Sequence, residues 1–246
     1  MKFLEYLKLK YRAGRYKYRN DRGGITYINS AISEGQTVFD IGAHKGAYIY
    51  YMRKKAGYKG KIVAFEPQIS LYNYILKIKK LFVWNNVIVE HLALSDAPGE
   101  ATLFIPPGKA GKASSPGATI LKDKFNLTHV TTENVSTETL DSYCQRNMLS
   151  PDFLKIDVEG NELNVLKGGI EIINKCRPKI LVEIEARHVG QRCVLETFNF
   201  LESLGYKGSL LFGMVKIPLS EFSFDKYQNA DDRKNYSNNF VFEHKK

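Results

Sequence analysis

The sequence predicts an α/β fold with a doubly wound, mostly parallel sheet, and three observations lead to this fold class. Short β-type apolar runs alternate with helix-type segments along the 246-residue chain. A glycine-containing turn follows the first of these runs. Four of the runs end in acidic residues, and the carboxyl ends of parallel strands meet at one edge of a sheet. Because charged groups are costly inside a sheet unless they are paired or solvated, these acids indicate one polar cleft.

In the first half of the chain, strand-type runs begin at Thr37, Lys61 and Val87. Apolar periodicity predicts the helices of this half at residues 26–33, 46–56 and 68–80. Residues 93–96 are expected to form a loop beside the cleft, where adenine contacts would be natural. Residues 101–105 are expected to return as an additional hairpin strand.

The second half continues the alternation of strands and helices. The strands are expected at residues 153–160, 180–185, 206–212 and 239–243, and the helices at residues 139–148, 161–175 and 190–204. Residues 221–238 read as an irregular loop. Because no second core is visible, we expect residues 26–246 to form one domain.

Residues 106–135 interrupt the pattern with many proline, glycine and serine residues. A long stretch of this composition inside a compact domain is usually functional or mobile. We therefore expect a lid or substrate loop over 106–135, with an insertion of no consequence as the alternative.

Residues 1–25 are expected to form a basic N-terminal arm with a helix. The formal net charge is +10, and residues 1–24 contribute +6 of it, from eight Lys and Arg against two acids. One helical stripe carries Phe3, Leu4, Leu7 and Tyr11, which predicts an amphipathic helix docked on the domain. The alternative is a helix attracted to an anionic membrane or to an acidic glycan or other anionic acceptor through residues 1–24.

The turn from Asp40 to Gly46 indicates a nucleoside-bearing cofactor. Glycine permits a sharp bend and a close approach of the backbone to a ligand, and the next helix offers its free N–H groups. Glu66, at the end of the second strand, stands where an acid usually reads a ribose diol. A dinucleotide fingerprint would need a third glycine, and the Asp40 carboxylate would repel a pyrophosphate. S-adenosylmethionine therefore fits better than NAD, and a nicotinamide dehydrogenase is a weaker alternative.

Acids at the later strand ends are the candidates for chemistry. Asp157 and Glu159 share one face of their strand if it extends that far, and His188 follows the acids Glu183 and Glu185. The candidate catalytic residues are Asp157, Glu159, Glu185 and His188, because a carboxylate or an imidazole can accept a proton near neutral pH. Each acid could instead be a solvated loop acid or a salt-bridge partner. Carboxylates also suit a divalent ion, but nothing in the spacing demands one, so no metal ligand is predicted.

The cysteines Cys144, Cys176 and Cys193 have no close paired spacing and suggest neither a disulfide framework nor a zinc site. No apolar run is long enough to span a bilayer, and charges interrupt the first apolar residues, so no signal peptide is expected. We therefore expect a cytoplasmic protein in a reducing compartment.

Three motifs in this order resemble the FkbM family of S-adenosylmethionine-dependent methyltransferases. They are Val38-Phe39-Asp40-Ile41-Gly42-Ala43-His44-Lys45-Gly46, Ala64-Phe65-Glu66-Pro67 and Asp152-Phe153-Leu154-Lys155-Ile156-Asp157-Val158-Glu159-Gly160-Asn161-Glu162. The resemblance covers about residues 36–243. It implies a class I methyltransferase (Rossmann-like) sheet of seven strands with the last strand antiparallel.

The resemblance also implies methylation of a hydroxyl on a sugar, a glycan or a natural product. Carried over by position, Asp40, Gly42 and Gly46 would line the methionine end, Glu66 the ribose, and Asp157 the reaction side. His44 stands where the family usually has asparagine. The residues expected to contact the cofactor are Asp40, Gly42, Ala43, His44, Gly46, Glu66, Pro67, Ala93 and Asp157.

Two alternative functions remain at this stage. The basic arm suggests a nucleic-acid methyltransferase, but the usual Asp/Asn-Pro-Pro-Tyr type motif is replaced by Asp157-Val158-Glu159-Gly160, so no nucleic-acid partner is expected. A cofactor-binding module without catalysis is the other alternative, and the crowding of acids at the reaction end argues against it. The expected partner is a small-molecule or glycan acceptor.

Overall fold

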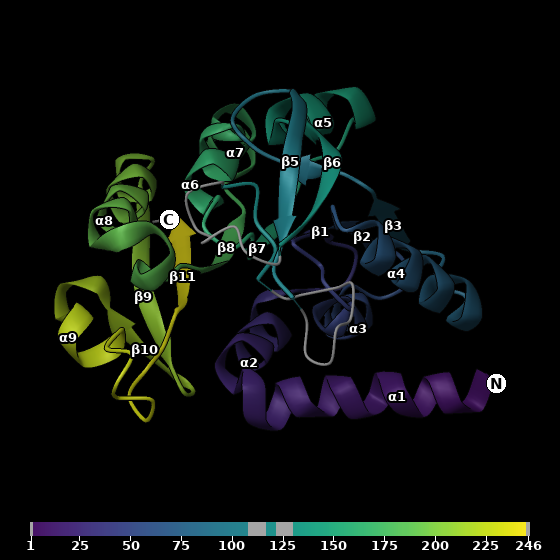
Figure 1. Cartoon of the computed structure of the whole chain (residues 1–246), viewed down its shortest axis with the longest axis horizontal. Helices are drawn as coiled ribbons and strands as arrows, with labels where there is room; N and C mark the ends of the chain where they lie inside the picture. Colours follow the sequence, from purple (N-terminus) through teal and green to yellow (C-terminus); the bar gives the residue numbers. More distant parts are fainter. Residues whose placement is uncertain (1, 108–116, 122–129, 245–246) are drawn as a thin grey trace.

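The fold is organised around a twisted sheet with helices on both faces (Figure 1). The computed structural model describes residues 2–107, 117–121 and 130–244. The helices are α1 (Lys2–Arg15), α2 (Arg22–Ala31), α3 (Ala47–Ala56), α4 (Ile69–Phe82), α5 (Leu140–Asn147), α6 (Glu162–Lys167), α7 (Ile170–Cys176), α8 (Ala186–Ser203) and α9 (Phe224–Tyr227), with a π-helical turn η1 (Tyr16–Asn20) and a 3-10 turn η4 (Leu219–Glu221). The strands are β1 (Thr37–Ile41), β2 (Lys61–Phe65), β3 (Val87–Glu90), β4 (Ala93–Leu94), β5 (Gly99–Ile105), β6 (Thr131–Glu138), β7 (Phe153–Ile156), β8 (Lys179–Glu183), β9 (Tyr206–Phe212), β10 (Val215–Pro218) and β11 (Asn239–His244).

The main sheet has eight strands among the described residues, in the order β10-β9-β11-β8-β7-β1-β2-β3. The strands β3, β2, β1, β7 and β8 are parallel, and β11 lies antiparallel between β8 and β9. The predicted class I sheet with its last strand antiparallel is therefore confirmed. The predicted number of seven strands was wrong, because β10 folds back antiparallel onto the edge of β9.

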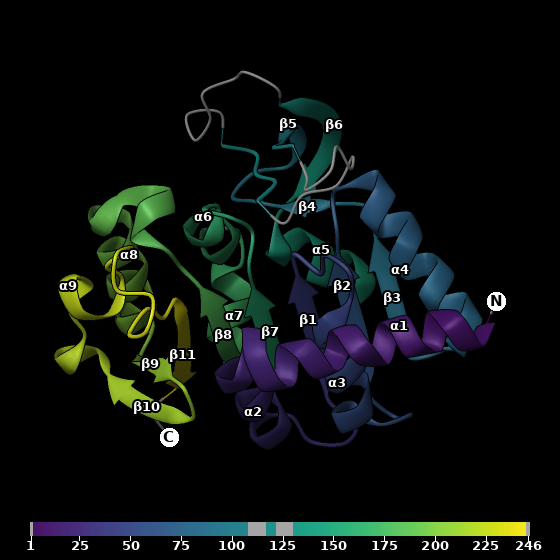
Figure 2. The same cartoon turned by 60° about the horizontal axis from the view of Figure 1, so that its bottom comes forward.

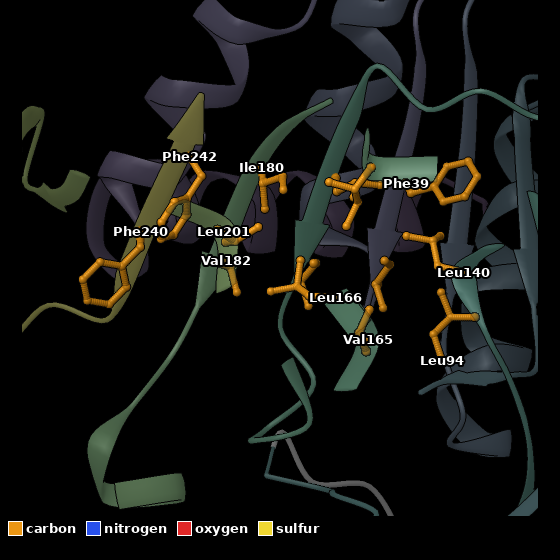
Figure 3. Close-up of a cluster of buried hydrophobic side chains, with 14 of the residues drawn as sticks. Phe39, Leu94, Leu140, Val165, Leu166, Ile180, Val182, Leu201, Phe240 and Phe242 are labelled. Carbon is orange, nitrogen blue, oxygen red and sulfur yellow. The ribbon is translucent and has the colours of Figure 1, made fainter. Parts of the chain in front are cut away.

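Each face of the sheet carries its own hydrophobic core. Successive strand residues point to opposite faces, so Phe39 joins one cluster and Val38 the other. Figure 3 shows the first cluster, in which Phe39, Val182 and Phe240 of the sheet meet Leu166 and Leu201 of the helices. The helices α5 to α8 cover this face, and α1 to α4 cover the other, as the two views in Figures 1 and 2 show. No helix in the described part of the chain is both long and apolar enough to cross a bilayer.

A small second sheet in the order β4-β6-β5 stands above the main sheet (Figure 2). The predicted hairpin strand over 101–105 is confirmed as part of β5. The prediction of a loop over 93–96 was wrong in part, because Ala93 and Leu94 pair with β6. The predicted loop 106–135 was also too long, because β6 pairs antiparallel with β5 from Thr131 onward. Residues 108–116 and 122–129 of that loop lie outside the described residues.

The predicted single helix over 161–175 is divided into α6 and α7 at Gly168 and Gly169. A Cβ on Gly168 would lie 2.1 Å from the carbonyl oxygen of Ser95, so only glycine lets the chain pass the loop after β4. The sequence pattern showed the apolar periodicity of both helices but not this close approach.

The helix α1 docks on the domain, although with a different face from the predicted one. Leu9 and Ala13 are each 1% exposed and belong to the core cluster under α1 to α4. Leu4, Leu7 and Tyr11, which were predicted as the docking stripe, are exposed. The prediction failed because the helix has apolar residues on two opposite faces, and the sequence does not say which face meets the core.

Candidate active site

A cavity of about 280 Å³ opens at the carboxyl ends of the parallel strands. Ile41, Phe65 and Glu183 line the cavity as the last residues of β1, β2 and β8. Asp157 lines it directly after the end of β7. Segments from both ends of the chain complete the wall, with Tyr16 from η1 and Asn238 just before β11. A ligand site at this edge of the sheet is the expected place in an open α/β fold.

The glycine turn after β1 forms one wall of the cavity. The backbone N–H groups of Gly42 and Ala43 both donate to the carbonyl oxygen of Phe65, at 3.0 Å each, which ties the turn to β2. Gly42 has φ +82°, and Gly46 has φ +70° as the N-cap of α3. Gly42, Ala43 and His44 line the cavity, whereas Gly46 is not part of its wall.

Replacing Gly42 by alanine is expected to lower the free energy of unfolding more than the same change at Gly35. Both glycines have positive φ, but an added Cβ at Gly42 would lie 1.8 Å from the carbonyl oxygen of Asp157, whereas Gly35 has open space. Both alanine variants lose stability because alanine disfavours a positive φ. The clash of the new Cβ at position 42 should lower the free energy of unfolding by about a further 1–3 kcal/mol. Urea unfolding of the two variants measures the difference, and equal losses would contradict the close approach.

Glu66 is held rigidly at the end of β2. Its Oε2 accepts from the backbone N–H of His44 at 2.6 Å, and its Oε1 accepts from the N–H of Gln68 at 2.9 Å. The side chain is only 3% exposed, and this burial raises the pKa of Glu66 to about 8. Apolar side chains lie beside it in the cavity wall, from Pro67, Ala93, Leu94, Leu103 and Ile120.

A buried lysine organises the opposite end of the cavity. The Nζ of Lys155 donates to Oδ2 of Asp157 and to the carbonyl oxygen of Gly42, each at 3.1 Å, and lies 3.5 Å from Oδ1 of Asp40. Burial by itself lowers the pKa of Lys155, but the carboxylates of Asp157 and Asp40 raise it above its ordinary value. The lysine therefore stays charged and holds the turn after β1 against the end of β7.

Asp40 lies inside β1 and pairs in register with Lys155 of β7. It is 0% exposed and is not part of the cavity wall, although the sequence placed it at the methionine end. Burial raises the pKa of Asp40 to about 6. In this structure its carboxylate faces the buried lysine beneath the cavity.

Further acidic and polar groups gather beside Asp157. The Nδ2 of Asn238 donates to Oε1 of Glu183 at 2.6 Å, and the hydroxyl of Tyr48 donates to Asp21. Burial first, and then the negative charges of Asp157 and Asp21, raise the pKa of Glu183 well above its ordinary value. Burial likewise raises the pKa of Asp21 to about 6.

The four candidate catalytic residues divide into two pairs. Asp157 and Glu159 line the cavity. Glu185 and His188 lie outside the wall, where Glu185 accepts from the hydroxyl of Tyr236 at 2.8 Å and the Nδ1 of His188 lies 3.3 Å from Oε2 of Glu159. His188 therefore lies next to Glu159 of the cavity wall without lining the cavity itself.

Several cavity residues were missing from the candidates predicted from the sequence. Lys155 carried a signal, because a lysine inside the apolar run from Phe153 to Ile156 needs a buried partner. Tyr16, Asp21 and Asn238 carried none, because they come from segments that only the tertiary fold brings to the sheet edge. No group of three or more His, Cys, Asp or Glu side chains in the described ranges is arranged to hold a metal ion.

These features fit S-adenosylmethionine and define a class of protein. The buried Glu66 carboxylate suits a ribose diol, the apolar side chains around it suit adenine, and the Gly42 turn lines the cavity. The strand order is that of a class I methyltransferase, and the cavity lies at the carboxyl ends of β1 and β7, where this order reverses. A family model described as "Methyltransferase FkbM domain" matches residues 40–207. The chain belongs to the FkbM family of S-adenosylmethionine-dependent methyltransferases, and the predicted family and cofactor are confirmed.

Several solved structures have a similar fold. A methyltransferase FkbM from Methylobacillus flagellatus KT has a TM-score of 0.54 and 14% identity, covering 89% of this chain and 50% of that chain. The chain therefore spans half the length of that protein. A putative rRNA methylase from Clostridium thermocellum has a TM-score of 0.51 and 11% identity, covering 89% of this chain and 90% of that one. An rRNA methylase from Streptococcus thermophilus has a TM-score of 0.51 and 11% identity, covering 91% and 95%. No curated protein sequence matches the chain.

The affinity for S-adenosylhomocysteine is expected to increase as pH rises toward about 8, the pKa to which burial raises Glu66. A ribose diol donates hydrogen bonds, so the ionised carboxylate binds it better, and below this pKa binding must release a proton. The affinity should then rise by about tenfold per pH unit at most. Calorimetric titration in buffers of different ionisation enthalpy measures the proton release. Glu66→Gln should abolish the pH dependence, and a wild-type affinity independent of pH would contradict the assignment.

Proposed function

We propose that the protein transfers the methyl group of S-adenosylmethionine to a hydroxyl oxygen of a sugar, a glycan or a natural-product acceptor. The observation that carries this proposal is the gathering of carboxyl groups at one end of the cavity. Asp157, Glu159 and Glu183 line it at the ends of β7 and β8, and Asp21 joins them from the segment after η1. Hydroxyl groups are weak acids and good hydrogen-bond donors, so carboxylates can both orient them and accept their proton.

Two carboxyl groups of the cavity wall, those of Asp157 and Glu183, have different roles in this reaction. When bound, S-adenosylmethionine supplies an electrophilic methyl group for an acceptor oxygen. Asp157, whose Oδ2 accepts from Lys155, is held at the cavity wall and accepts the proton of the acceptor hydroxyl. Glu183 has a raised pKa and, in its protonated form, donates a hydrogen bond that orients the acceptor. The remaining rate enhancement comes from positioning and from exclusion of water.

Residues of the cavity also bear on the alternative of a nucleic-acid acceptor. Binding to a phosphate backbone relies on lysine and arginine contacts. The described wall carries two cations, Lys45 and Lys155, and Lys155 is turned toward carboxylates in the interior. The likeness to two rRNA methylases is one of fold. A small polyhydroxyl acceptor is favoured by this balance of charge.

The proposal is tested in two stages. Calorimetric titration with S-adenosylhomocysteine, with NAD as the control ligand, establishes the cofactor site first. Transfer of a labelled methyl group is then measured with a panel of glycans, nucleotide sugars, polyketides and RNA. Base-stable transfer to a hydroxyl compound supports the proposal. Transfer to RNA bases alone would overturn it, and tight cofactor binding with no transfer to any acceptor would favour a non-catalytic module.

A further inference from the structure

The outer face of α1 carries an apolar stripe that no described part of the molecule covers. Leu4, Leu7 and Tyr11 are 56%, 45% and 69% exposed, and Tyr18 in η1 continues the stripe at 70%. The spacing of three and four residues places the first three on one side of the helix, opposite the buried Leu9. In Figure 1 the helix runs along the outer edge of the molecule. Contiguous apolar side chains exposed to water usually mark an interaction site, so the stripe indicates a partner.

Exposed cations flank this stripe. Lys8, Lys10, Arg15 and Lys17 are exposed, and Oε1 of Glu5, the acid of the same helix, lies 3.5 Å from Nζ of Lys8 and 3.6 Å from Nζ of Lys77 on α4. The outward surface of the helix therefore combines aliphatic and aromatic side chains with positive charge. This combination is typical of helices that lie in the interface of an anionic membrane.

We propose that α1 and η1 bind the surface of an anionic lipid bilayer, with Leu4, Leu7, Tyr11 and Tyr18 inserted and the flanking cations on the headgroups. A second copy of the chain fits less well, because two such faces would bring basic flanks together. A nucleic acid would use the cations but would leave the leucines without an apolar partner. An anionic bilayer offers an apolar interior to the leucines and tyrosines and negative headgroups to the cations.

The same segment leads directly into the cavity. Tyr16 lies in η1 only two residues before Tyr18, and Tyr16 and Asp21 both line the cavity wall. The segment proposed to contact the bilayer is therefore continuous in sequence with the end of the cavity where the carboxyl groups gather. The binding itself does not depend on the proposed function, because it uses none of the cavity residues.

Flotation of the full chain with vesicles tests this proposal. We expect co-flotation with vesicles of phosphatidylcholine and phosphatidylglycerol, and little with phosphatidylcholine alone. Replacing both Leu4 and Leu7 by serine should weaken partition by about tenfold or more. Replacing Lys8 and Arg15 by glutamine should weaken it by about 20-fold. These four side chains are exposed, so the variants should retain the wild-type circular dichroism spectrum and melting temperature.

A matched control lies on the opposite layer of the molecule. Met148 is 93% exposed and Lys175 is exposed beside it, so the pair Met148→Ser and Lys175→Gln removes the same kinds of side chain away from α1. This control should float like the wild type. Absence of flotation of the wild-type chain at low ionic strength would overturn the proposal, as would flotation that survives the leucine substitutions. A concentration-dependent dimer lost in the leucine variant, without vesicle binding, would instead assign the stripe to self-association.

Discussion

Replacing Asp157 by asparagine is expected to lower kcat by about 10³-fold, because a positioned proton acceptor contributes about 10²–10⁴-fold to such a reaction. The amide oxygen of asparagine can still accept from Lys155, whose Nζ lies 3.1 Å from Oδ2 of Asp157. The wall therefore keeps its geometry while losing the proton acceptor. Steady-state kinetics with the acceptor found in the labelled-methyl screen measures this effect.

The affinity for S-adenosylhomocysteine separates catalysis by Asp157 from binding. We expect the Asp157→Asn variant to bind the product within about tenfold of the wild type, far less than its loss of kcat. Glu159→Gln tests the other candidate acid of the wall, and Asp96→Asn is a control at an exposed acid that does not line the cavity. If Asp157→Asn lowered turnover and the affinity for S-adenosylhomocysteine equally, the catalytic role of Asp157 would be contradicted. A larger loss of kcat in Glu159→Gln would transfer that role to Glu159.

Replacing Lys155 by methionine is expected to lower the free energy of unfolding by about 3–5 kcal/mol, the usual loss when one partner of a buried ion pair is removed. The substitution leaves the Asp40 carboxylate, which is 0% exposed, without its cation. It also releases the carbonyl oxygen of Gly42, to which Lys155 donates. Urea unfolding measures the loss. Lys61→Met, at an exposed lysine at the start of strand β2, is the control and should change stability by less than about 0.5 kcal/mol.

The pH dependence of this variant identifies Asp40 as the uncompensated charge. Burial raises the pKa of Asp40 to about 6 even beside the lysine, so its contribution to stability is present at low pH and is lost as pH rises through this value. The destabilisation by Lys155→Met should therefore be smaller below pH 6 than above it. Adding Asp40→Asn should restore part of the lost stability. A loss that is the same at all pH values, and unchanged by Asp40→Asn, would contradict the pairing.

Features that depend on local pattern could be predicted from the sequence. Alternating strand and helix periodicities predicted the α/β sheet, because each element buries one face with its own repeat. The glycines at 42 and 46 predicted the turn, because few other residues tolerate its positive φ. The acids at 66 and 157 predicted the two ends of one cavity, because the carboxyl ends of parallel strands meet at one edge.

The buried faces and the neighbours of these elements could not be predicted, because they depend on how distant segments pack together. Asp40 was expected to face a ligand, but the register of β1 against β7 places it opposite Lys155. Glu185 was expected at the cavity, but Tyr236 and Asn238 donate to it from the segment before β11. In α1, Leu7 and Leu9 belong to apolar stripes on opposite faces of the helix. Packing against the domain buries Leu9 and leaves Leu7 exposed. Register, facing and long-range partners are properties of two or more segments together, so no single stretch of sequence contains them.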